Sequence, residues 1–64
     1  MTGREAARQI LTMVLDDVTS YGENAGQLHR EGSLILSRRY SDYADAANII
    51  ANKILMSIQD GEFD

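Results

Sequence analysis

Apolar residues recur at helical spacing near the start of the chain. A single stripe contains Ala7, Ile10, Leu11, Val14, Val18 and Tyr21, and Leu15 widens it on one side. Thr2 and Glu5 stand three residues apart, as in a capping box, and Gly22 stands where a left-handed residue would end a helix. This pattern predicts a first helix over residues 4–21.

A second apolar stripe follows and predicts a longer helix over residues 33–59. It contains Leu36, Tyr40, Tyr43, Ala47, Ile50, Ile54 and Ile58 at steps of three or four residues, with Ala44, Ala51 and Leu55 on the same face. Ser33 is a good N-cap and Gly61 can close the helix. Ser41 and Asp42 resemble another helix start, which leaves a kink near Ser41 as the alternative to one continuous helix.

The segments around these helices predict the rest of the architecture. Residues 22–32 contain Gly26 and Gly32, and we expect a loop there, with room for a single helical turn. The tail 60–64 is expected to fray. The fold class is therefore all-α: a single domain, residues 1–64, forming an antiparallel helical hairpin in which the longer helix overhangs the shorter by about 12 Å.

Some large apolar residues of the second helix lie outside its stripe. On a helical wheel Ile49 and Met56 lie together, away from Ile50 and Ile54, with Ile35 between them and the stripe and Leu34 on the far side. One hairpin partner cannot cover so wide an arc. We therefore predict an interface at the residues Leu34, Ile35, Ile49 and Met56.

Size and composition strengthen the expectation of self-association. A chain of 64 residues has a marginal core, and it contains no Cys and a single histidine, His29, with which to build a stabilising crosslink or metal site. We therefore expect a dimer or larger helical bundle without cofactor or metal. The net charge of −4 disfavours binding to duplex nucleic acid, and the absence of a long apolar run or signal sequence predicts a cytoplasmic protein without a membrane partner.

Candidate chemistry is concentrated at Arg38, Arg39 and Tyr40. Two guanidinium groups beside a phenol are suited to holding phosphate or stacking on a base, which makes these three residues the candidate ligand site. The alternative is structural, with Asp17 and Arg39 closing one edge of the hairpin as an ion pair. No nucleophile, acid–base pair or phosphate-binding loop is recognisable, so we predict no catalytic residues and no enzymatic activity.

Two segments resemble a known family. Arg4-Glu5-Ala6-Ala7 is similar to the first helix of the phage anti-CBASS cyclic-nucleotide sponges and their related hairpin domain, and residues 30–38, running into Ala47-Asn48, resemble a later part of it. The resemblance implies an oligomeric hairpin that sequesters cyclic signalling nucleotides, with Arg38 at the family's basic position. The chain departs from the family's pattern in lacking Pro and in having Ala46 where Trp is usual.

Two functional hypotheses follow from these observations. The first is a small acidic phage or mobile-element accessory protein that binds and inhibits or modulates a larger protein. The second is an oligomeric sponge for a small anionic ligand such as a cyclic oligonucleotide, which would block anti-phage signalling in the host cytoplasm. An acidic mimic of DNA ranks last, because the acidic residues are dispersed among arginines.

Overall fold

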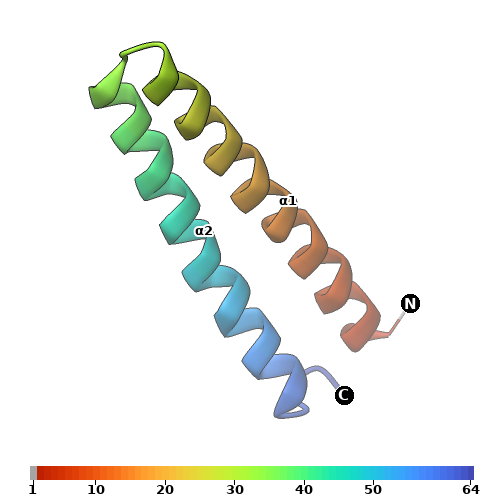
Figure 1. Ribbon diagram of the computed structural model, residues 1–64. Helices are drawn as coiled ribbons and strands as arrows, with labels where there is room; N and C mark the ends of the chain where they lie inside the picture. Colours follow the sequence, from red (N-terminus) through yellow and green to blue (C-terminus); the bar gives the residue numbers. More distant parts are fainter. Residues whose placement is uncertain (1) are drawn as a thin grey trace.

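Two long helices joined by a tight turn make up the protein in this computed structural model, which describes residues 2–64. Helix α1 spans Gly3–Arg30 and helix α2 spans Leu34–Gln59. The helices lie side by side and run in opposite directions, which places both termini at one end (Figure 1). The predicted all-α antiparallel hairpin is confirmed, while Met1 of the predicted domain 1–64 lies outside the described residues.

Helix α1 continues nine residues beyond its predicted end at Tyr21, so the prediction of a loop over residues 22–32 is wrong for most of that range. The stripe in fact extends past Tyr21, because Ala25 and Leu28 follow it at steps of four and three and pack toward α2. Each glycine in a helix costs about 1 kcal/mol relative to alanine. Burial of Ala25 and Leu28 offsets that cost at Gly22 and Gly26.

Glycines with positive φ end both helices. Gly32 has φ of 83°, and the next amide, Ser33 N–H, donates to the Leu28 carbonyl at 2.9 Å. Gly61 has φ of 79°, and Glu62 N–H donates to the Ser57 carbonyl at 3.0 Å. These are the bonds of a Schellman motif, so the prediction for Gly61 is confirmed, whereas the one for Gly22 is wrong.

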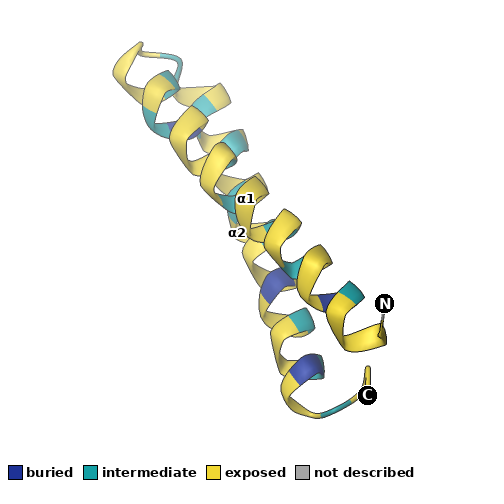
Figure 2. Ribbon diagram, turned by 90° about the vertical axis from the view of Figure 1, so that its right-hand side faces the viewer, coloured by how far each residue is buried: buried dark blue, intermediate teal, exposed yellow. Residues whose placement is uncertain are grey.

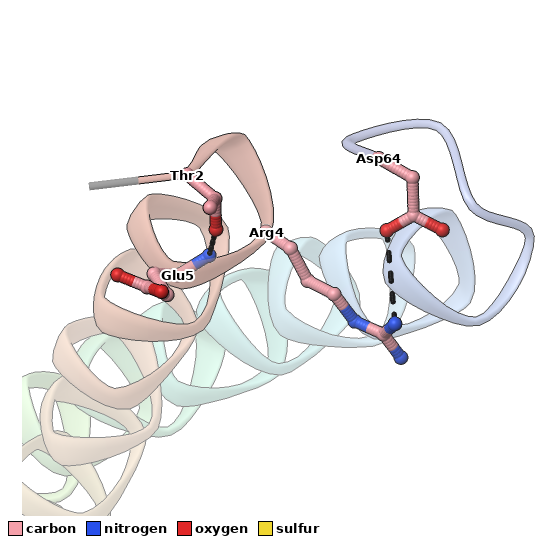
Figure 3. Close-up of polar contacts among 4 residues, drawn as sticks. All are labelled: Thr2, Arg4, Glu5 and Asp64. Atoms are coloured by element: carbon pink, nitrogen blue, oxygen red, sulfur yellow. Dashed lines mark hydrogen bonds and ion pairs between the residues drawn. The ribbon is translucent and has the colours of Figure 1, made fainter.

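Both N-caps lie at the residues that the sequence predicts, but only one of them uses its side chain. Thr2 Oγ1 accepts from the Glu5 amide at 3.1 Å, as predicted (Figure 3). Ser33 occupies the N-cap position of α2, but its side chain forms no capping hydrogen bond. The prediction of Ser33 as the N-cap is therefore confirmed, and its carbonyl accepts the first helical bond, from Ser37 N–H.

The two helices are almost equally long, which removes the predicted overhang. Helix α1 has 28 residues and α2 has 26, about 42 and 39 Å at 1.5 Å per residue. Helix α2 passes Ser41 without interruption, so the continuous helix, rather than the kinked alternative, is confirmed.

The C-terminal tail folds back instead of extending away as a frayed end. After the turn at Gly61, the backbone carbonyl of Phe63 approaches Gly3 so closely that a Cβ there would lie 2.8 Å from it. Arg4 and Asp64 form an ion pair at 3.7 Å between half-exposed side chains (Figure 3). The tail, which follows α2, therefore contacts the first residues of α1.

Small side chains dominate the seam between the helices. The buried residues are Ala7, Ala25, Ala51 and Ile58, and three of these four are alanine (Figure 2). Ser37 Oγ of α2 donates to the Ala25 carbonyl of α1 at 2.8 Å, so a short side chain spans the gap between the helices. Small residues at these positions allow this close approach.

Candidate interaction surface

Four large apolar side chains on α2 were predicted to form an interface, and all four are exposed. The exposed fractions are 58% for Leu34, 76% for Ile35, 56% for Ile49 and 61% for Met56. Successive helical residues are about 100° apart, which places Ile35, Ile49 and Met56 on the side of α2 opposite α1. We call these three residues the outer row. The hairpin itself does not cover these three residues, and the partner that would cover them stays a prediction.

A second exposed row appears where the sequence predicted core. Leu36, Tyr43 and Ile50 lie seven residues apart on α2, beside the seam, and are 46–52% exposed. We call these residues the flank row. Their expected place in the core is wrong, as is that of Ile10 on α1, which is 51% exposed.

The positions that do face α1 differ from the flank row by one residue. Ser37, Ala44 and Ala51 also lie seven residues apart, and all three are buried or half-buried. The steps from Ser37 through Tyr40, Ala44, Ala47, Ala51, Ile54 and Ile58 alternate regularly between three and four. That regular alternation could have identified the face of α2 that packs against α1. The larger apolar residues at neighbouring positions led the sequence analysis to assign Leu36, Tyr43 and Ile50 to that face instead.

Three tyrosines form an aromatic cluster where the flank row meets the seam. Tyr21 lies 6.2 Å from Tyr40 and 5.6 Å from Tyr43 between ring centroids, and Tyr40 lies 5.6 Å from Tyr43 with nearly perpendicular rings. Tyr21 and Tyr40 are half-buried, and Tyr43 is 50% exposed. The cluster fixes one edge of the Tyr43 ring against both helices and leaves the rest available to a partner.

The candidate ligand residues do not converge on one pocket. Arg38 and Arg39 are exposed, and over residues 2–64 the ion pairs within 4.0 Å include neither of them. The proposed pairing of Asp17 with Arg39 is therefore wrong. Tyr40 instead lines a shallow groove of about 340 Å³, whose other lining residues are Asn24, Gln27, Leu28, Glu31 and Leu36. That lining contains an acidic residue and no basic one.

Other kinds of site find no support in the described part of the chain. Residues 2–64 contain no cluster of three acidic or histidine side chains that could hold a metal ion. Neither α1 nor α2 combines the length and apolar character that crossing a membrane requires. His29 is exposed near the end of α1. The features that distinguish this surface are thus its two apolar rows.

Comparisons with protein-family models, with characterised proteins and with solved structures gave no match to this chain. The resemblance to the cyclic-nucleotide sponges thus stays a prediction, and the surface itself must support any functional proposal.

Proposed function

We propose that this protein is a non-enzymatic, self-associating helical hairpin that binds a larger protein and inhibits or modulates it. The observation that carries the proposal is the outer row, where Ile35, Ile49 and Met56 are all more than half exposed on the side of α2 away from α1. Scattered apolar residues are ordinary on a protein surface, but three large apolar side chains on one side of a helix, with Asp42 between Ile35 and Ile49, favour a partner. An accessory role in a phage or mobile element, in the host cytoplasm, belongs to the same proposal.

The chemistry of the outer row suggests the kind of surface that it binds. Aliphatic side chains spaced along a helix fit an apolar groove or the apolar face of another helix. The chain has ten acidic and six basic residues, so charge favours a groove with a basic rim. We therefore expect a partner with an apolar groove bordered by Lys or Arg.

Affinity capture with matched variants tests the proposal. The wild-type chain should retain a stoichiometric protein partner, and Ile49→Lys combined with Met56→Lys should lose it. A control with Asn52→Lys and Asn48→Lys makes the same charge change at two exposed polar positions of α2 and should retain the partner. Titration with the purified partner should then reproduce the difference. Equal retention by both double variants would contradict the use of the outer row.

An alternative proposal is a sponge for a small anionic ligand such as a cyclic oligonucleotide. It is supported by two exposed adjacent guanidinium groups, at Arg38 and Arg39, without an ion-pair partner in residues 2–64. Glu31 in the groove beside Tyr40 weighs against it, because an acidic group repels an anion. If the sponge exists, cyclic oligonucleotides should raise the melting temperature by an amount that grows with ligand concentration, and Arg38→Ala should abolish that rise.

A further inference from the structure

The hairpin is one layer thick and therefore incomplete as a folded domain. Its principal extents are 47 × 17 × 11 Å, and its radius of gyration is 14.5 Å, against about 10.7 Å expected for a compact chain of this length. Stable domains consist of at least two layers that enclose a core. Among residues 2–64 only four are buried, and the largest of them is Ile58. A second layer must come from outside the chain.

The accessible surface that exceeds that of a compact monomer indicates how large an interface with a second layer would be. The accessible surface is 4795 Å², whereas a compact monomer of 7.1 kDa exposes about 4,100 Å². The excess is about 700 Å², close to the roughly 800 Å² that each partner contributes to a stable protein–protein interface. One additional hairpin on one face supplies that area.

The flank row has the spacing that a contact between two identical helices requires. In a twofold contact, the same patch of each copy must complement itself. Leu36 and Ile50 each lie seven residues from Tyr43, so a twofold axis at Tyr43 places Leu36 of one copy beside Ile50 of the other. All three residues are uncharged, so no like charges meet along the row.

The corresponding row of α1 explains why α2 forms the centre of this contact. Asn24 and Leu36 line the same groove, so they lie on the same side of the hairpin. Going toward the N-terminus in steps of seven, Asn24 is followed by Asp17 and Ile10. That row is apolar only at Ile10, and a contact centred on it would bury Asp17 or Asn24.

We infer that a second copy of this chain packs against the flank row, with the two α2 helices antiparallel about a twofold axis near Tyr43. This inference rests on the self-association in the proposed function and assigns it a face. The two hairpins then form a four-helix assembly in which each provides the second layer of the other. The outer row stays exposed on the dimer, where it is available to a different protein.

Adjacent isoleucines provide a matched test of the assigned face. Ile49 and Ile50 are 56% and 52% exposed, but they point in directions about 100° apart. Sedimentation equilibrium of the wild type should give twice the 7.1 kDa mass of one chain. Ile50→Lys should raise the dissociation constant by about 30-fold or more, as expected for a central interface residue. Ile49→Lys should leave it within about threefold.

A disulfide crosslink tests the same contact if Ile50→Lys fails to fold. The chain contains no Cys, so Tyr43→Cys creates a thiol that can pair only with its own counterpart in a second copy. A residue near the twofold axis satisfies the short Cα–Cα distance that a disulfide needs, so an oxidised dimer should form readily. Asp42→Cys, on the exposed side away from the flank row, is the control and should crosslink much less.

The possible results separate this inference from the proposed function. Dissociation by Ile49→Lys but not by Ile50→Lys, or equal crosslinking at positions 42 and 43, would overturn the assigned face and leave self-association intact. A monomeric wild type would overturn both the face and the self-association. Loss of partner capture by the outer-row variant, with the dimer preserved, would support the protein-binding function independently.

Discussion

The seam between the helices and the rows beside it use apolar residues in opposite ways. The buried residues of the seam are three alanines and one isoleucine, whereas the flank and outer rows expose large side chains. A two-helix protein that depended on its own core would place its largest aliphatic side chains in the seam, since buried apolar area is the main stabilising term. Here several of the largest aliphatic side chains lie in the exposed rows instead.

This difference indicates what each region contributes. The seam fixes the pairing of the two helices, because alanines and the bond from Ser37 to the Ala25 carbonyl hold them close. The rows carry apolar area that stabilises the protein only when another surface covers it. Changes in the seam should therefore alter stability within one hairpin, whereas changes in the rows should alter association.

The largest effect should come from truncating the largest buried side chain of the seam. Ile58 is 6% exposed, and Ile58→Ala should lower the free energy of unfolding by about 2–5 kcal/mol. Ile35→Ala, at 76% exposure, should change it by no more than about 0.5 kcal/mol. Urea denaturation at a fixed protein concentration measures both. Similar losses for the two variants would show that the seam is not the principal core.

A smaller loss should follow when the seam is made too large. Ala51 is 2% exposed, so Ala51→Leu forces the helices apart and should cost about 1–3 kcal/mol. Ala46 is exposed on the same helix, and Ala46→Leu should stay within about 0.5 kcal/mol of the wild type. Thermal and urea unfolding distinguish the two. A stabilising Ala51→Leu would mean that the seam contains unfilled space.

The sequence alone predicted the hairpin and both apolar stripes, because helical periodicity is a local property of the chain. The prediction failed at Gly22, where the local preference of glycine indicated the end of the first helix. The helix instead continues to Arg30, because Ala25 packs against α2. It also misplaced Leu36, Tyr43 and Ile50, because large side chains were assumed to mark the core. The rotation of each helix about its own axis decides which neighbouring position is buried, and that rotation depends on how both helices pack together.

The candidate site was predictable in part for the same reason. The outer row was predicted from the sequence, because the apolar arc of α2 is too wide for one partner helix to cover. Its residues would be left exposed whichever part of the arc packed against α1. The pairing of Asp17 with Arg39 could not be judged, because it depends on how the helices rotate about their axes. The contact between the tail and α1 was missed, as nothing local in residues 60–64 indicates it.

Removing the polar contact across the seam should have a moderate effect. Ser37→Ala deletes the donor to the Ala25 carbonyl and should cost about 0.5–1.5 kcal/mol. Ser41→Ala, one turn later and exposed, is the matched control and should be nearly neutral. Chemical denaturation of both variants provides the comparison. A neutral Ser37→Ala would show that close approach depends on alanine packing alone.

The smallest effect should come from the ion pair at the open end of the hairpin. Arg4 and Asp64 are half-exposed, so a double-mutant cycle with Arg4→Ala and Asp64→Ala should give a coupling of roughly 0.2–1 kcal/mol, diminished by salt. The same cycle with Asp17→Ala and Arg39→Ala should give none, because those two residues form no ion pair. Coupling between Asp17 and Arg39 would mean that the helices are rotated about their axes relative to this structure. The flank row would then turn toward the seam, and the second copy would lose its contact surface.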